Sequence, residues 1–252
     1  MIRGVLLDLS GVLYIGDKPV PGATGAVKRL AGAGVPVRYI TNTTRSTRQM
    51  ILHRLTRIGF DIAAEDIFTA PIASRQYVET NNLIPFLLIH PNLEPEFCDM
   101  RGEPNAVLVG DAGDRFTYSN MNNAFRYLLD GATLLAMDIN RYFNEGNRFS
   151  LDAGPFVHAL EYASGTKALV LGKPSLEFYS TAVKSLGCGP EDAVMVGDDV
   201  EADVIGAVNA GLNGILVRTG KFIQGDEKKI KTNALCVADI SAAVDYILEQ
   251  MK

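Results

Sequence analysis

Hydrophobic residues along this chain follow two patterns that alternate with one another. Short continuous apolar runs, typical of buried strands, are followed by segments in which apolar residues recur every three or four positions. In the segment "STRQMILHRLTRIGF", for example, Ile51, Leu55 and Ile58 fall on one face of a helix. The predicted strands are 4–9, 35–40, 167–172, 192–197 and 213–219, and the predicted helices are 22–34, 46–60, a segment from Ser175, 202–211 and 241–251. This alternation predicts a Rossmann-like, doubly wound α/β core with a mostly parallel sheet.

The middle of the chain carries a second α/β pattern with different spacing. Its apolar runs "PFLLIH", "NAVLVG" and "ATLLAMD" alternate with the helical stretches "MNNAFRYLLDG" and "GPFVHALEYA". We therefore predict an inserted α/β domain at 80–166, within a core built from 1–79 and 167–252.

The composition indicates a soluble globular protein. The 252 residues are 47% hydrophobic and 21% charged, which is typical of a soluble globular protein. A net charge of −5 without a basic stripe argues against a nucleic-acid partner, although a small anionic substrate stays possible. Because no run of about 18 apolar residues occurs, we expect no membrane span.

Cysteine and histidine usage adds to this picture. The cysteines are few, odd in number and far apart, as expected of reduced thiols in a cytoplasmic protein, and the first apolar run is too short for a signal peptide. The histidines lack the spacing of metal ligands. These residues are Cys98, Cys188, Cys236, His53, His90 and His158.

Polar groups suited to phosphate chemistry follow four of the predicted core strands. They are Asp8 with Ser10, "TNTT" at 41–44, "GKP" at 172–174 and "GDDVEAD" at 197–203. Ligands bind at the carboxyl ends of the strands in an open α/β sheet, so we expect the four segments to meet there.

Each segment supplies a group that phosphoryl transfer requires. Asp8 could attack phosphorus and form an aspartyl-phosphate. Thr41, Asn42 and Thr43 could bind phosphoryl oxygens, and Lys173 offers a positive charge. Taken singly, these residues are ordinary turn formers, helix caps or loop residues, but four loops in this order favour a phosphate site.

Carboxylates also gather among these segments. Asp8, Asp198 and Asp203 would bring three negative charges to one place, which requires a cation. Hard oxygen ligands select Mg²⁺, so we expect magnesium as the cofactor.

The order of these motifs resembles the haloacid dehalogenase superfamily, in the type with a large α/β cap inserted between the second and third motifs. Stretches such as "DLSGVLY", "NMNNAF", "LDAGPF", "GKPS" and "VRTGKF" are similar to the cap-bearing phosphatases of phosphohistidine, phospholysine and inorganic pyrophosphate. The resemblance implies a hydrolase that acts on a small phosphorylated substrate or a phosphoprotein.

The resemblance also implies a role for each position. Asp8 would be the nucleophile and a Mg²⁺ ligand, together with Asp198 and the main-chain carbonyl of Ser10. Asp203 would bind the metal through water or orient Lys173. Thr41 and its neighbours would hold the transferred phosphoryl group.

For the cap, the resemblance implies closure over the site and a homodimer formed through the cap. Our candidate specificity loop is 149–155, with Asp152 as a substrate-binding residue. Apolar residues of the insert should form its buried core, or a dimer surface if exposed; they are Phe86, Leu87, Leu88, Phe125, Tyr127 and Leu128.

Ser10 departs from the superfamily pattern, in which a second aspartate usually stands two residues after the nucleophile and serves as general acid. A serine hydroxyl is a poor proton donor near neutral pH. Substrates whose leaving group needs no such help would be favoured. Phosphoramidates qualify because the leaving nitrogen is itself basic, and pyrophosphate and activated esters qualify because they leave easily.

Three other classes of protein share parts of this pattern. Ser10 is also compatible with a phosphate-binding regulatory protein that has lost efficient catalysis. A nucleotide-dependent dehydrogenase would need a GxGxxG motif after the first strand, which the sequence lacks. A phosphorylated receiver domain would be shorter and without the insert.

Overall fold

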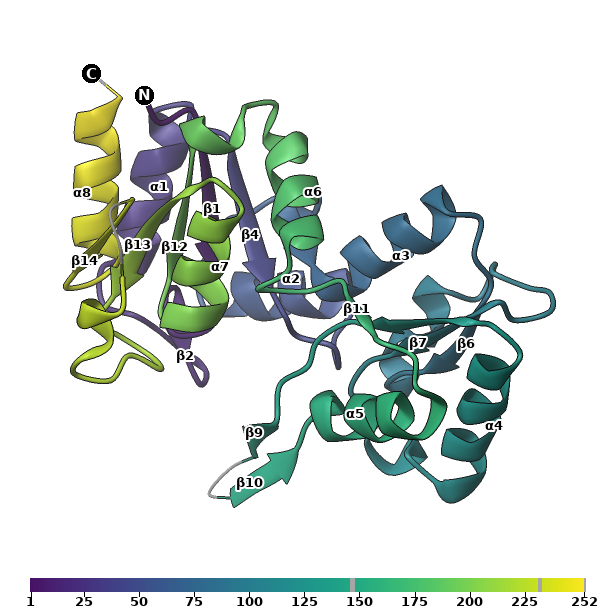
Figure 1. Cartoon of the computed structure of the whole chain (residues 1–252). Helices are drawn as coiled ribbons and strands as arrows, with labels where there is room; N and C mark the ends of the chain where they lie inside the picture. Colours follow the sequence, from purple (N-terminus) through teal and green to yellow (C-terminus); the bar gives the residue numbers. More distant parts are fainter. Residues whose placement is uncertain (146–147, 231–232, 252) are drawn as a thin grey trace. The chain divides into compact units, whose positions relative to one another are not determined.

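The computed structural model describes residues 1–145, 148–230 and 233–251, and it divides the chain into two compact units (Figure 1). The first unit contains residues 1–41, 48–68 and the chain from Lys173 onward. The second unit contains residues 42–47 and 69–172.

A six-stranded sheet forms the centre of the first unit, with β1 parallel to both β12 and β4. Its strands are short apolar runs, and β1 is buried at every position. In spatial order they are β14 (Ala234–Val237), β13 (Asn213–Val217), β12 (Ala193–Gly197), β1 (Gly4–Asp8), β4 (Val37–Thr41) and β5 (Ile67–Thr69).

Helices cover both faces of this sheet (Figure 1). One face packs against α1 (Ala23–Gly32), α2 (Arg48–Arg57) and α8 (Ile240–Gln250). The other face packs against α6 (Leu176–Leu186), the π-helix η5 (Val200–Ile205) and α7 (Gly206–Asn209). Shorter elements are β2 (Tyr14–Ile15), β3 (Lys18–Pro19), η1 (Ala64–Asp66), η4 (Pro190–Asp192) and η6 (Asp226–Lys228). The doubly wound α/β class is therefore confirmed.

A four-stranded parallel sheet forms the centre of the second unit. In spatial order its strands are β11 (Leu169–Val170), β8 (Thr133–Ala136), β7 (Ala106–Val109) and β6 (Pro85–Leu88). One face packs against α3 (Ala70–Thr80) and η2 (Pro91–Glu96), and the other against α4 (Tyr118–Leu129) and α5 (Ala153–Ser164). The remaining short helix is η3 (Gly113–Arg115).

The boundaries of the second unit differ from the predicted insert of 80–166. Helix α3 belongs to this unit because Ala70 and Val78 pack with Leu93 and Leu108 in one buried cluster. Residues 167–172 were predicted as a core strand, which is wrong, since β11 pairs with β8 of the second sheet. Periodicity identifies a strand but not the sheet that it joins.

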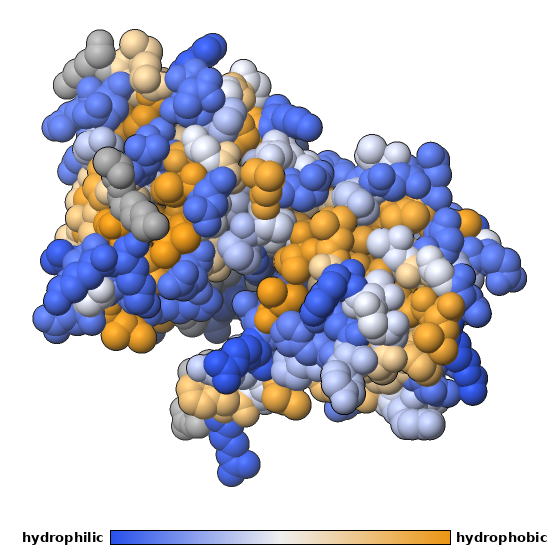
Figure 2. All heavy atoms as spheres, viewed as in Figure 1, coloured by the Kyte–Doolittle hydropathy of each residue, from blue (hydrophilic) through white to orange (hydrophobic). Residues whose placement is uncertain are grey.

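An antiparallel hairpin, β9 (Tyr142–Glu145) and β10 (Arg148–Leu151), also belongs to the second unit. The predicted specificity loop of 149–155 is therefore partly strand and partly the start of α5. The residues Tyr142, Phe149 and Leu151 are 54%, 75% and 61% exposed, and Figure 2 shows hydrophobic residues at the surface of this hairpin.

The apolar residues for which we expected burial in the insert are mostly covered. Leu88 and Leu128 are buried in the core against α4 and α5. Phe86, Phe125 and Tyr127 are partly buried against the same cluster, and Leu87 against the opposite one. Across the described ranges, no helix has both the length and the apolar character of a membrane span.

Two glycine substitutions should change stability in opposite directions. In α1, an added Cβ at Gly25 meets no atom within 4 Å, so Gly25→Ala should stabilise the protein by about 0.5–1 kcal/mol through helix propensity. In α5, a Cβ at Gly154 would overlap the carbonyl oxygens of Ile139 and Asn140, so Gly154→Ala should destabilise it by about 1–3 kcal/mol. Thermal denaturation measures both; a Gly154→Ala melting temperature at or above that of the wild type would contradict the packing described.

Candidate active site

Three carboxylates meet at the carboxyl edge of the first unit's sheet. Asp8 is the last residue of β1, Asp198 directly follows β12, and Asp203 lies in η5. One ligand oxygen from each lies within 4.8 Å of the others, and the three residues are only 6%, 3% and 1% exposed. Adjacent parallel strands ending at the same level explain why the first two meet.

Lys173 lies between two of these carboxylates. Its Nζ forms an ion pair with Oδ1 of Asp8 and donates a hydrogen bond of 2.7 Å to Oδ1 of Asp203. The Lys173 side chain is 5% exposed, so these interactions are shielded from solvent. Removing one partner of such a buried pair typically costs about 3–5 kcal/mol.

The electrostatics of this cluster favour an additional cation. Burial, with Asp203 and Asp198 nearby, raises the pKa of Asp8 to about 7 despite Lys173. Burial and Asp203 raise the pKa of Asp198 to about 6. Burial lowers the pKa of Lys173, but Asp203 and Asp8 outweigh burial and raise it overall. One ammonium thus faces three buried carboxylates, and their hard oxygen atoms fit a divalent cation such as Mg²⁺.

The π-helix η5, which follows β12, carries Asp203 to the carboxyl edge of the sheet. Asp199 caps this helix, since its Oδ1 accepts hydrogen bonds from the main-chain N–H groups of Glu201 and Ala202 at 3.1 and 3.0 Å. The hydroxyl of Tyr179 lies 2.7 Å from the carbonyl oxygen of Ala202. π-Helical turns often occur at functional sites.

A turn after β13 also reaches the carboxylates. The hydroxyl of Thr219 donates to the carbonyl oxygen of Gly11 at 2.5 Å, and the main-chain N–H of Lys221 donates to Oδ2 of Asp198 at 2.6 Å. We assigned no role to this turn from the sequence. The motif "VRTGKF" was part of the family resemblance, but nothing in its residue types indicates contact with an aspartate.

The other predicted site residues fall in two groups. Ser10 is exposed on the turn after β1, and Thr41 is buried at the end of β4, one residue beyond the partner of Asp8. Asn42, Thr43 and Asp152 belong to the second unit, so their roles in phosphate or substrate binding stay predictions.

Within the second unit, polar residues form a separate buried network. The main-chain N–H of Asp111 donates to Oγ1 of Thr44 at 3.2 Å, and the same hydroxyl lies 3.5 Å from Oδ2 of Asp138. Arg45 forms an ion pair with Asp111, and its guanidinium lies 4.4 Å from the centre of the Phe143 ring. The segment 42–47 is thereby held inside the second unit.

Two buried acids of the second unit, Asp138 in this network and Asp152, have raised pKa values. Burial, with the nearby Asp152, raises the pKa of Asp138 to about 8, which favours the protonated acid. Burial also raises the pKa of Asp152, whose Oδ1 accepts the main-chain N–H of Ala153 at 2.8 Å and caps α5.

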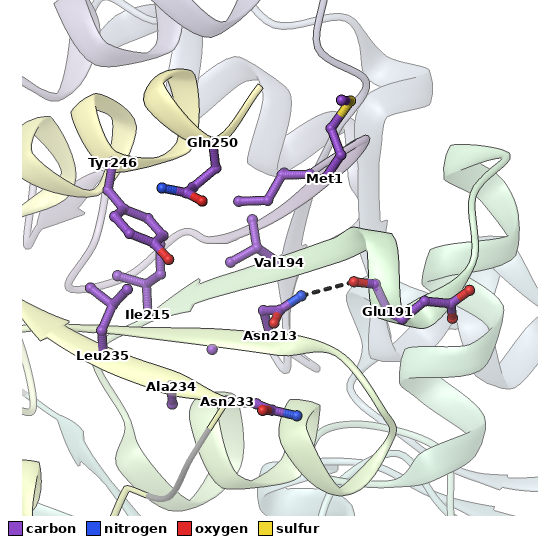
Figure 3. Close-up of a pocket in the computed structure, with 12 residues that line it drawn as sticks. Met1, Glu191, Val194, Asn213, Ile215, Asn233, Ala234, Leu235, Tyr246 and Gln250 are labelled. Atoms are coloured by element: carbon purple, nitrogen blue, oxygen red, sulfur yellow. Dashed lines mark hydrogen bonds between the residues drawn. The ribbon is translucent and has the colours of Figure 1, made fainter. Parts of the chain in front are cut away.

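A cavity of about 410 Å³ lies at the opposite, amino edge of the first unit's sheet (Figure 3). Tyr246 and Gln250 of α8 face it, and Asn213 donates a hydrogen bond of 3.0 Å to the carbonyl oxygen of Glu191 beside it. None of the candidate catalytic residues is among the described residues that line it.

Comparison with known proteins identifies the class. Residues 5–100 match the family model described as haloacid dehalogenase-like hydrolase, and residues 170–243 match a second HAD-hydrolase-like model. A bovine (Bos taurus) protein called haloacid dehalogenase-like hydrolase domain-containing protein 2 is 46% identical over 252 residues, covering 99% of this chain and 97% of its own. The chain therefore belongs to the haloacid dehalogenase-like hydrolase family, which confirms the resemblance seen in the sequence.

Other relatives carry more specific names. The human (Homo sapiens) phospholysine phosphohistidine inorganic pyrophosphate phosphatase is 41% identical, covering 98% of this chain and 95% of its own. Among solved structures, the 4-nitrophenylphosphatase of Thermotoga maritima superposes with a TM-score of 0.89 at 23% identity, covering 98% of this chain and 97% of its own. That structural similarity shows the shared fold.

The buried acid of the second unit gives a prediction about pH. Folded Asp138 keeps its proton up to a pH of about 8, whereas the unfolded chain loses it near 3.8. The raised pKa of Asp138 therefore stabilises the fold fully below pH 3.8, and this stabilisation is lost as the pH rises through 8. Asp138→Asn, which mimics the protonated acid, should lose less stability than the wild type between pH 5 and 9 in thermal denaturation. The exposed Asp130→Asn serves as control, and parallel pH curves for wild type and Asp138→Asn would refute this role.

Proposed function

We propose that this hydrolase is a Mg²⁺-dependent phosphatase that works through a covalent aspartyl-phosphate on Asp8. The observation that supports this most directly is the buried cluster in which Lys173 contacts Asp8 and Asp203 while Asp198 lies alongside. Such a cluster combines a nucleophile, a fixed positive charge and ligands for a divalent cation at the ligand-binding edge of the sheet.

In the first step, a carboxylate oxygen of Asp8 attacks phosphorus while the bond to the leaving group breaks, and the leaving atom keeps that electron pair. Lys173 holds the carboxylate of Asp8 in place from one side. Magnesium, held by Asp8, Asp198 and the Ser10 carbonyl, would supply positive charge for the phosphoryl oxygens. Water then hydrolyses the acyl phosphate, which releases inorganic phosphate and restores Asp8.

The substrate class follows from Ser10. Because no second carboxyl group stands two residues after the nucleophile, the leaving group must depart without a strong general acid. General acid catalysis typically increases the rate by about 10² to 10⁴. We infer that phosphohistidine, phospholysine, pyrophosphate or activated esters are the substrates, as small molecules or on a phosphoprotein. The name of the 41% identical human relative supports this inference.

The exposed hairpin supports a proposal about assembly. The ring centres of Tyr142 and Phe149 lie 5.0 Å apart in an edge-to-face arrangement, and both residues are more than half exposed. Apolar groups gathered at the surface can mark an interaction site. We propose that the chain forms a homodimer through its second unit. The free thiols of Cys98, Cys188 and Cys236 support a cytoplasmic location.

A second candidate function is a phosphate-binding regulatory protein with little catalysis, and Ser10 is the observation that favours it. The Asp8–Lys173 pair argues against it, because a binder has no need for a buried nucleophile.

Hydrolysis of p-nitrophenyl phosphate with Mg²⁺ distinguishes the two functions. We expect measurable release of nitrophenolate by the wild type and a loss of at least about 10³-fold in Asp8→Asn, because the nucleophile is gone. The exposed Asp61→Asn is the matched control and should retain full activity. Equal activity in Asp8→Asn and the control would exclude the proposed intermediate.

A substitution at Ser10 tests the dependence on the leaving group. Ser10→Asp supplies the missing proton donor, so kcat/KM should rise by about 10² or more for alkyl phosphates. It should change little for a phosphohistidine peptide, whose leaving nitrogen carries its own proton. Measuring both substrates on both proteins decides the matter; equal gains on the two, or none on either, would reject the argument.

A further inference from the structure

We propose that the turn Thr219–Lys221 is a positioning element of the catalytic centre, which fixes the Asp198 carboxylate and the turn after Asp8 for cation binding. This inference rests on the proposed magnesium site. It assigns a function to a segment that supplies no side chain to the reaction itself.

Two hydrogen bonds connect this turn to the site. The Thr219 hydroxyl donates to the carbonyl oxygen of Gly11 at 2.5 Å, and Gly11 directly follows Ser10, whose carbonyl we assign to the metal. The main-chain N–H of Lys221 donates to Oδ2 of Asp198 at 2.6 Å. A charge-assisted bond of this kind orients a carboxylate strongly.

The turn packs tightly against the Asp198 carboxylate and Gly11. Gly220 has φ +60° and Gly11 has φ +88°, which favours glycine at both positions. A Cβ on either residue would overlap the Asp198 carboxylate, and one on Gly220 would also lie 2.5 Å from the Cα of Gly11. The Asp198 carboxylate is thus enclosed by two glycines from different loops.

The hydrogen bond also distinguishes the two oxygens of Asp198. Because Oδ2 accepts the Lys221 N–H, Oδ1 would be the less engaged of the two oxygens when a cation binds. A carboxylate held in one orientation pays less ordering entropy when a cation binds, so the turn should increase the affinity for Mg²⁺.

The side chain of Lys221 contributes much less than its main chain. Its Nζ lies 3.1 Å from Oδ2 of Asp199, but the Lys221 side chain is 68% exposed. Ion pairs this exposed contribute little. The main-chain N–H, by contrast, is present whatever side chain stands at position 221, which allows the two contributions to be separated by mutation.

The test is Mg²⁺ binding to the full chain, measured by isothermal titration calorimetry. Gly220→Ala should raise the Kd for Mg²⁺ by at least about tenfold, through displacement of the Asp198 carboxylate. Lys221→Ala should stay within about twofold of the wild type, since it keeps the N–H donor. Gly34→Ala is the matched control for backbone strain, because Gly34 has φ +69° and nothing within 4 Å of an added Cβ; its affinity should not change.

A second pair of variants covers the case in which Gly220→Ala does not fold. Thr219→Val removes the hydroxyl donor and should weaken Mg²⁺ binding several-fold, whereas Thr219→Ser keeps the donor and should restore it. The role of the turn would be overturned if Thr219→Val, and Gly220→Ala if it folds, bound Mg²⁺ with wild-type affinity. If Asp198→Asn lost binding in the same experiment, the proposed function would still stand. Unchanged Mg²⁺ binding in Asp198→Asn would instead overturn the magnesium site itself.

Discussion

The buried contact of one lysine with two aspartates is the interaction on which the rest of this structure depends. Lys173 and Asp8 are 165 residues apart in the chain, so the site is complete only when distant segments of the sequence have folded together. The ammonium neutralises only part of the charge that it faces, and burial raises the pKa of Asp8 to about 7. Burying several charges together destabilises the folded state. Such clusters are expected at functional sites, where perturbed pKa values are common.

Several independent devices hold this cluster together. A π-helical turn capped by Asp199 presents Asp203 to the lysine, and the turn after β13 holds Asp198. Most of these contacts are hydrogen bonds to main-chain groups. The positions of Asp198 and Asp203 therefore depend more on backbone geometry than on the identity of neighbouring side chains. The second unit has a network of its own, in which Thr44 and Arg45 fix the chain that continues from Thr41.

The parts of this protein that could be predicted from sequence are those with strong local signals. Strand β1 is a continuous apolar run that ends in Asp8, and β12 is one that Asp198 directly follows. Both strands, and the meeting of Asp8 with Asp198, agree with the sequence-based prediction. Strand β11 was assigned to the wrong sheet because two paired residues carry no information about their partner. The Thr219 turn was missed for a related reason: its contacts use a hydroxyl, an N–H and the absence of a Cβ, none of which is recognisable without the fold.

The central claim is that an oxygen of Asp8 captures phosphorus. A crystal structure of the full chain with Mg²⁺ and beryllofluoride, which mimics an acyl phosphate, tests it most directly. The account predicts beryllium bonded to a carboxylate oxygen of Asp8, with a metal ion beside it and Lys173 still in contact with the site. Beryllofluoride bound elsewhere, with the Asp8 carboxylate unmodified and distant from any cation, would contradict it.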